Sequence, residues 1–228
     1  MKLPINQIIC GDCLEVMKDW PDNCVDLVLT DPPYGINKKL TDGGGKRKYQ
    51  KSRRLYIGKT WDKNPITKKE INSMLRIGRN QIIFGGNYFK MPPCRCFLIW
   101  DKLNHLPTMS RVEFIWTSFD LPAKYFAVRA TQKIRIHPTQ KPINLLLTIL
   151  NKYSKSTDLI IDPYCGSGTT CVAAKMLGRR YIGIDTDSEY CQITEDRLKG
   201  VRSSLLRSLK KKTPEQTLGI KTKKRRIK

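Results

Sequence analysis

The chain has 228 residues, of which 39% are hydrophobic and 28% charged, enough for one well-buried domain with insertions. No apolar stretch approaches the roughly 18 to 20 residues of a membrane span, and the amino terminus lacks the basic start and cleavage site of a signal peptide, so we expect a cytoplasmic protein. The formal net charge of +23 favours a polyanionic partner, because such a field attracts one by steering and by counterion release.

The positive charge is concentrated in two segments. Residues 38–59 carry nine Lys or Arg against one acid, and residues 199–228 carry twelve against one. The rest of the chain is close to neutral. A single basic run is as easily a solubilising surface, but two runs beside a near-neutral body favour nucleic acid as the partner.

Short apolar runs alternate with segments of helical period along the chain, a pattern typical of βα units. The predicted strands span residues 7–10, 25–30, 81–84, 96–100, 113–117, 159–162 and 181–184. The predicted helices span residues 13–18, 67–79, 142–153, 168–177 and 188–198, the last with room to continue through residue 207. The sequence therefore predicts one α/β domain over residues 1–208, with a mostly parallel sheet and helices on both faces.

Two segments do not fit this alternation. Residues 35–65 are rich in Gly, Lys and Arg without an apolar period, and a loop of that length inside a compact domain is usually functional or disordered. We expect a mobile basic loop that orders on nucleic acid. Residues 209–228 are basic and poor in hydrophobic residues, too few to offset the chain entropy of folding, so we expect a flexible tail.

The chain has eight cysteines, which only His105 and His137 could join as nitrogen ligands. We therefore expect no metal site. Most of the thiols are expected to pack as small hydrophobic groups in a reducing compartment.

The strand predicted at residues 25–30 runs straight into Asp31-Pro32-Pro33-Tyr34. The two prolines hold Asp31 and Pro32 extended and remove two N–H donors. The result is a rigid turn at the carboxyl end of a strand, where open α/β sheets bind ligands. A carboxylate, bare carbonyls and a ring predict a site that accepts hydrogen bonds and stacks a planar group; a proline turn with a purely structural role is the alternative.

Such a site suits the chemistry of an exocyclic base amine. This amine is a poor nucleophile because its lone pair is delocalised into the ring, so its methylation requires two acceptors for its hydrogens and a fixed line of attack. Asp31 and the carbonyl of Pro32 could supply the acceptors, and Tyr34 could hold the base by stacking. Asp31, Pro32, Pro33 and Tyr34 are the candidate catalytic residues.

A second motif, residues 160–170, reads as a strand, a glycine-bearing turn and a helix start. Glycines let the backbone approach a ligand, and a helix amino terminus offers free N–H donors. About twenty residues later the strand at 181–184 ends in Asp185, where a doubly wound fold places a carboxylate on a ribose. The missing third glycine and Walker lysine argue against NAD and ATP. The two elements therefore predict another nucleoside cofactor, with a tight turn that binds nothing as the alternative.

Together these segments resemble the DNA amino-methyltransferases, whose hallmarks are the D-P-P-Y tetrapeptide and a D-P-F-x-G-S-G-T-T cofactor turn. Tyr164 stands where that family usually has Phe, and it keeps a ring near the cofactor adenine. The resemblance covers about residues 8–198, and the order of the motifs is similar to that of the beta group. It implies a Rossmann-like, S-adenosylmethionine-dependent methyltransferase fold with a target-recognition insert at residues 101–136.

The resemblance also implies further cofactor contacts. His137 lies in H-P-T-Q-K-P (137–142), similar to a segment that lines the methionine end of the cofactor; otherwise it is a loop histidine before a helix. Asp12, beside Cys13, resembles the residue that meets the adenine amine, although a helix cap explains it equally well. The candidate cofactor-binding residues are Asp12, Cys13, Asp31, His137, Tyr164, Gly166, Ser167, Gly168, Thr169, Thr170 and Asp185.

The implied function is methyl transfer from S-adenosylmethionine to adenine N6 in double-stranded DNA after base flipping. Three alternatives remain open: N4-cytosine methylation, which the family more often couples to Ser at position 31, an RNA adenine methyltransferase, and an inactive DNA-binding protein. No segment matches a restriction nuclease, and whether the chain pairs as a homodimer also stays open. Charge alone makes phosphate-binding candidates of the basic tail and of Lys46, Arg47, Lys48, Arg53 and Arg54.

Overall fold

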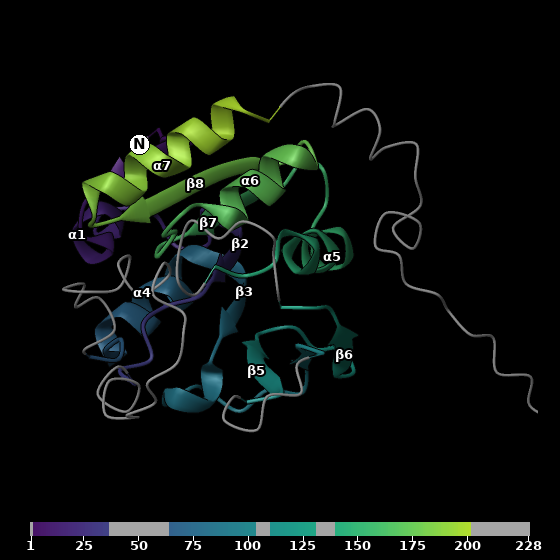
Figure 1. Cartoon of the computed structure of the whole chain (residues 1–228). Helices are drawn as coiled ribbons and strands as arrows, with labels where there is room; N and C mark the ends of the chain where they lie inside the picture. The colour runs from purple at the N-terminus through teal and green to yellow at the C-terminus, as the bar shows by residue number, and fades with distance from the viewer. Residues whose placement is uncertain (1, 37–63, 104–109, 131–139, 202–228) are drawn as a thin grey trace, which may run out of the picture.

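A single sheet organises the chain in the computed structural model, which describes residues 2–36, 64–103, 110–130 and 140–201. Its eight strands lie in the order β1-β8-β7-β2-β3-β5-β4-β6 (Figure 1). Only β5 runs antiparallel to its neighbours, so the prediction of a mostly parallel sheet is confirmed. The strands are β1 (Gln7–Cys10), β2 (Val25–Thr30), β3 (Gly78–Phe84), β4 (Phe97–Asp101), β5 (Val112–Thr117), β6 (Lys124–Ala127), β7 (Leu159–Asp162) and β8 (Arg180–Asp185).

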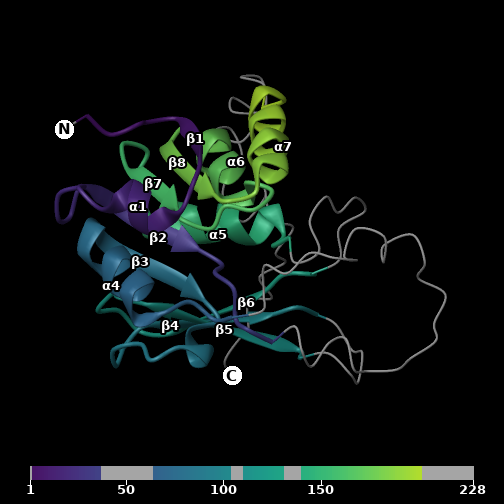
Figure 2. The ribbon, with the colours of Figure 1, turned by 90° about the vertical axis from the view of Figure 1, so that its left-hand side faces the viewer.

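Helices cover both faces of the sheet, as predicted (Figure 2). One face carries α5 (Ile143–Tyr153), α6 (Thr169–Met176) and α7 (Ser188–Lys199), and the other carries α1 (Cys13–Met17) and α4 (Lys68–Ile77). Successive strand residues point to opposite faces, so in β2 Leu27 packs into the first core and Val28 into the second. Burial on both sides explains why three successive residues of β2, at positions 27–29, are apolar.

The predicted bounds agree best for strands that the sequence marks with apolar runs. β1, β2 and β7 span the predicted residues. β3 begins at Gly78, three residues before the predicted start at Gln81, directly after α4. The helix stops there because Gly78 is extended, with φ −96° and ψ 135°. At its other end, α4 is held by a capping box between Thr67 and Glu70.

Two short elements are absent from the prediction. The 3₁₀ helix η1 (Gly86–Tyr88) follows β3, and β6 adds an edge strand that pairs with β4. The side chains of β6 are mostly exposed, so its sequence lacks the apolar period by which a strand is recognised. Within the described ranges, no helix is both long and apolar enough to cross a bilayer.

The strand directions bring the chemistry-bearing residues to one edge of the sheet. The carboxyl ends of β2, β7 and β8 meet there. Asp31 directly follows β2, and Asp162 and Asp185 are the last residues of β7 and β8. Because β5 is reversed, it brings its first residues to this edge, and Glu113 is the register partner of Trp100 near the end of β4. Acids from four strands therefore border one site.

Candidate functional site

The tetrapeptide after β2 places a carboxylate that is already engaged on both oxygens. The phenol of Tyr34 donates a hydrogen bond to Asp31 Oδ1. On the other side, the amino group of Lys141 donates to Asp31 Oδ2 over 2.6 Å. Burial raises the pKa of Asp31, and the Lys141 cation counteracts that rise. Asp31 is thus a partly buried acceptor whose charge depends on a lysine that lies 110 residues further along the chain.

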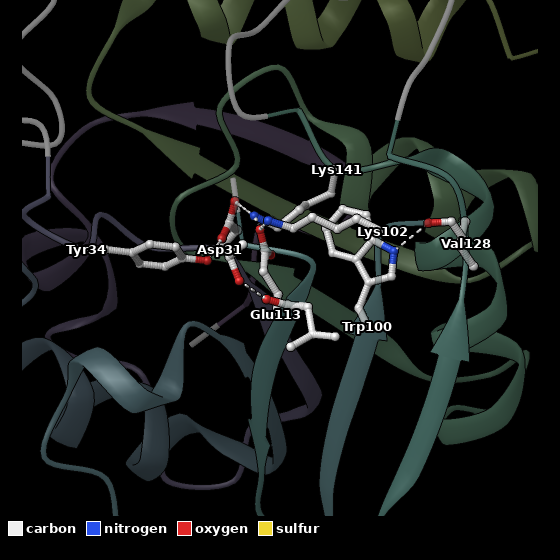
Figure 3. A network of polar contacts seen from close by, with 9 residues as sticks. Asp31, Tyr34, Trp100, Lys102, Glu113, Val128 and Lys141 are labelled. Carbon is white, nitrogen blue, oxygen red and sulfur yellow. Dashed lines mark hydrogen bonds and ion pairs between the residues drawn. The ribbon is translucent and has the colours of Figure 1, made fainter. Parts of the chain in front are cut away.

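Lys141 belongs to a larger set of alternating charges (Figure 3). Its Nζ lies 3.3 Å from Glu113 Oε2, and Glu113 Oε1 lies 2.8 Å from Lys102 Nζ. The Lys141 side chain is only 9% exposed. Burial lowers the pKa of Lys141, but Asp31 and Glu113 outweigh it and raise that pKa overall. Lys141 therefore stays protonated between two carboxylates.

The ring of Tyr34 is enclosed by aromatic neighbours. It stacks on Tyr88 of η1, with ring centroids 4.9 Å apart and planes inclined by 13°, and meets the ring of Phe89 edge-on at 6.0 Å. A Cβ at Gly85 would lie 2.3 Å from Tyr34 Cε1, so the ring lies directly against the backbone there. A base stacked on the face that Tyr88 covers would have to displace Tyr88.

The glycine turn after β7 has the shape that the sequence predicts. Gly166 and Gly168 have φ values of 50° and 76°, a left-handed backbone that favours glycine. A Cβ at Gly168 would lie 2.1 Å from Thr194 Cγ2. From α7, Thr194 Oγ1 donates to Gly166 O over 2.9 Å, and Arg197 donates to the carbonyl of Ser167. The turn is fixed by α7 from outside.

The carboxylates of Asp185 and Asp12 both bind backbone N–H groups. Asp185 Oδ2 accepts from Gly166 N and Oδ1 from Asp187 N, over 2.8 and 2.9 Å. A carboxylate has about four acceptor positions, so Asp185 retains capacity for further donors. Asp12 Oδ1 accepts from Leu14 N over 2.8 Å and caps α1. The helix-cap reading of Asp12 is therefore correct, although Asp12 also borders the cavity described below.

Tyr164, which stands where the family usually has Phe, is hydrogen-bonded to the two helices α1 and α4 that cover one face of the sheet. Its hydroxyl donates to Glu70 Oε1 on α4 over 2.7 Å and accepts from the thiol of Cys13 on α1 over 3.4 Å. Burial raises the pKa of Tyr164, and it raises the pKa of Cys13 to about 11. Both groups therefore stay protonated near neutral pH.

Asp162, at the end of β7, is a buried carboxylate held by neighbours. Thr30 Oγ1 donates to its Oδ1 over 2.7 Å, and Tyr164 N donates to the same atom over 3.1 Å. Burial raises the pKa of Asp162 to about 6. The bonds of Asp162 link the end of β2 to the glycine turn.

One cavity of about 280 Å³ lies at this edge of the sheet. Pro32, Tyr34 and Gly168 do not line it. The candidate residues that line it are Asp12, Cys13, Asp31, Pro33, Tyr164, Gly166, Ser167, Thr169, Thr170 and Asp185. The structure thus joins the predicted catalytic loop and cofactor turn in one cavity.

Several lining or adjoining residues were not among the candidates, and four of them bear directly on the chemistry of the site. Glu70, Lys141 and Asp162 line the cavity, and Glu113 contacts Lys141. Lys141 and Asp162 lie inside the motifs already recognised. Glu113 is an acid at the head of an otherwise apolar strand, a signal that could have been noticed, whereas nothing local distinguishes Glu70.

The remaining candidates lie outside the described residues: His137, the basic-loop residues Lys46, Arg47, Lys48, Arg53 and Arg54, and the basic tail. Across the described part of the chain, no cluster of three or more His, Cys, Asp or Glu side chains is placed to hold a metal ion. Cys10 and Cys13 have C-x-x-C spacing, but Cys10 is exposed and Cys13 is bonded to Tyr164. Five of the eight thiols are buried, in agreement with the prediction that most pack as small hydrophobic groups.

Sequence comparison relates the chain to DNA methylases. Residues 98–196 match the family N6_N4_Mtase, described as DNA methylase. The type II methyltransferase M.HinfI of Haemophilus influenzae is 27% identical over 87% of this chain and 69% of its own length. The putative methylase YubD of Escherichia coli K12 is also 27% identical, over 88% of this chain and 93% of its own length.

Solved structures share the fold. The structure of M1.HpyAVI with SAM covers 84% of this chain and 98% of its own, with a TM-score of 0.53 and 23% identity. The PvuII DNA methyltransferase, cytosine-N4-specific, covers 88% and 92%, with a TM-score of 0.58 and 15% identity. This chain thus shares its fold with these methyltransferases, as predicted.

Proposed function

We propose that this chain, which belongs to the DNA amino-methyltransferases, moves a methyl group from S-adenosylmethionine to N6 of adenine in double-stranded DNA. The observation that carries this proposal is the shared cavity. Asp31 of the tetrapeptide and the turn at residues 166–170 line it together. A group that accepts amine hydrogens therefore lies beside a group suited to a nucleoside cofactor.

The residues present fit S-adenosylmethionine. Asp185 borders the cavity with acceptor capacity to spare for ribose hydroxyls. Tyr164 supplies a ring for the adenine, and the helix start at Thr169 and Thr170 offers hydroxyls and backbone donors. When bound, this cofactor supplies the methyl group on a positively charged sulfur. Its presence in M1.HpyAVI, a protein of the same fold, agrees with the assignment.

The chain's own residues would activate the amine. The ionised carboxylate of Asp31 accepts a hydrogen of the base amine, and the carbonyl of Pro32 accepts the other, which turns the nitrogen lone pair toward the cofactor. As the nitrogen gains positive charge in the attack, the negative charge of Asp31 stabilises it. Tyr34 fixes Asp31 through its phenol. The amine then releases one proton, for which Asp31 is the proposed acceptor.

The preference for adenine rests on Asp31, and N4-cytosine is the second candidate because a cytosine-N4-specific enzyme shares the fold. In either case the target amine is hidden in the duplex, so the base must be flipped, at a cost of a few kcal/mol. The basic loop at residues 35–65 and the basic tail are proposed to hold the opened duplex by its phosphates.

The direct test is product analysis. The purified protein is incubated with S-adenosylmethionine and unmethylated genomic DNA, and the digested nucleosides are identified by mass spectrometry. N6-methyladenine is expected. N4-methylcytosine would retain the mechanism and change the base, and no product on DNA would overturn the proposal.

Asp31→Ala tests the mechanism in the same assay. Methyl transfer is expected to be lost while cofactor and DNA binding, measured by titration calorimetry and fluorescence anisotropy, are largely kept. Asp19→Ala, at an exposed position, is the matched control and is expected to behave as the unmodified protein. Turnover retained in Asp31→Ala would show that another group accepts the amine hydrogens.

A further inference from the structure

Asp31 ends a chain of four alternating charges. Its members follow β2 (Asp31), precede α5 (Lys141), lie in β5 (Glu113) and follow β4 (Lys102). Asp31 meets Lys141 at 2.6 Å, Lys141 meets Glu113 at 3.3 Å, and Glu113 meets Lys102 at 2.8 Å. The side chains are 22%, 9%, 20% and 14% exposed in that order. Solvent therefore screens these pairs weakly. Figure 3 shows both lysine amino groups converging beside the two carboxylates.

The Lys141 cation has opposite effects on the proposed reaction. It favours the ionised form of Asp31, the form that accepts the amine hydrogens. However, a positive charge next to an amine that becomes positive in the attack opposes the reaction. Glu113 pairs with the same ammonium and offsets this charge. Its Oε2 is buried and lies 3.3 Å from Lys141 Nζ. The two lysines hold the pKa of Glu113 below its usual value, so Glu113 remains a local negative charge.

We propose that Lys141 and Glu113 are opposed positioning residues for Asp31. Lys141 holds the carboxylate ionised and fixes one of its oxygens, which leaves a lone pair of the other for the base amine. Glu113, itself held by Lys102, limits the positive field of Lys141 at the amine. This inference rests on the proposed methyl transfer. It names two residues that control the ionisation and the orientation of the proposed catalytic carboxylate.

The charges around Asp31 predict two effects of opposite sign. Lys141 lowers the pKa of Asp31, and Glu113 raises it. Lys102 keeps Glu113 ionised, since the two lysines outweigh burial and lower the pKa of Glu113. Tyr34 donates to Asp31 from the same loop. On the neighbouring strand, the charge of Asp31 in turn contributes to the raised pKa of Asp162.

The acidic limb of the pH profile of kcat/KM reports the pKa of an essential carboxylate such as Asp31 in the free enzyme. Lys141→Met removes the neighbouring cation, so the limb is expected to move to higher pH by about one unit or more. Glu113→Gln removes the neighbouring anion, so the limb is expected to move to lower pH by about half a unit. Lys141→Arg keeps the charge and is expected to restore the limb, with a reduced kcat.

Matched controls separate this effect from a change in net charge. Lys152→Met alters an exposed lysine in the last turn of α5, and Glu195→Gln alters an exposed acid of α7. Neither is expected to move the limb. DNA and cofactor dissociation constants, measured alongside, are expected to change less than kcat in the Lys141 and Glu113 variants.

The outcomes separate the two proposals. An unmodified protein that methylates no DNA at any pH would refute the proposed function itself. If the unmodified protein is active, the acidic limb of kcat/KM is compared between Lys141→Met and Glu113→Gln. A limb that moves in neither variant, or in the same direction in both, would show that the two residues serve only the fold. Should Lys141→Met fail to fold, the other two variants still test the proposal. The acidic limb is expected to move to lower pH in Glu113→Gln and to stay at its original pH in Lys141→Arg.

Discussion

Replacing Tyr164 by Phe removes one hydroxyl from the cavity wall and leaves the ring. That hydroxyl donates to Glu70 Oε1 over 2.7 Å and accepts from Cys13 over 3.4 Å. It is the contact by which α4 and α1, on one face of the sheet, fix the wall of the proposed cofactor site. We expect Tyr164→Phe to lower the free energy of unfolding and to retain cofactor binding, since the ring remains.

The magnitude follows from the partner's charge. A hydrogen bond to a charged group contributes about 1.5 to 3 kcal/mol. Glu70 is only partly buried, so the lower half of that range applies, and the weak thiol donor adds little. A loss of about 2 kcal/mol lowers the midpoint of thermal unfolding by roughly 4 to 8 °C in a chain of this size.

Urea unfolding measures the effect, with Glu70→Gln and the double variant completing a cycle. The amide oxygen of the Glu70→Gln variant can retain the capping box with Thr67, so the helix start is preserved. The charge is lost, and the acceptor for the Tyr164 hydroxyl is replaced by an NH2 group. Tyr164→Phe is then expected to cost about 1 kcal/mol less when it is made in the Glu70→Gln variant. A Tyr164→Phe protein within about 0.3 kcal/mol of the unmodified one, or an additive cycle, would refute the reasoning.

Three further predictions concern the glycine turn, the buried acid and the basic loop. Gly168→Ala is expected to cost more than about 2 kcal/mol in urea unfolding, because φ is 76° and the new Cβ would meet Thr194; adding Thr194→Ala should recover part of the loss, and no recovery would place the cost elsewhere. The raised pKa of Asp162, about 6, means that its contribution to stability is full below about pH 4, its ordinary pKa, and is lost as the pH rises past its folded pKa. Asp162→Asn is therefore expected to be more stable than the unmodified protein in mildly alkaline buffer by up to about 3 kcal/mol, and a gap that does not close in acid would contradict this. Neutralising Lys46, Arg47, Lys48, Arg53 and Arg54 should flatten the salt dependence of DNA binding by a slope of up to about 4.5; an unchanged slope would mean that they touch no phosphate.

The sequence predicts the buried half of the sheet well and its exposed end poorly. β2 and β7 are covered by helices on both faces, so most of their residues are apolar and each strand can be recognised from the sequence. β6 lies at the edge with its side chains largely in solvent, so nothing selects an apolar period in Lys124–Ala127. β3 extends to Gly78 because register with β2, rather than local propensity, recruits its polar first residues.

The candidate site divides in a similar way. Asp31 and the glycine turn can be predicted because their function demands an unusual local sequence. Glu113 is marked in the sequence only as an acid at the start of a strand; its place at the site depends on β5 running antiparallel between β3 and β4. Glu70 is a helix residue whose partner Tyr164 lies 94 positions away. Contacts of this kind are set by topology, which local pattern does not encode.

The reversed strand β5 also has an evolutionary consequence. Asp101 and Val112 are register partners, and Lys102 N donates to Arg111 O over 2.9 Å, so the connection between β4 and β5 leaves and rejoins the sheet at the edge that borders Asp31. Its length and sequence can drift without disturbing strand order, because both of its ends are fixed by the ladder. A change in the length of this connection would therefore alter the chain beside Asp31 and leave the order of the strands as it is.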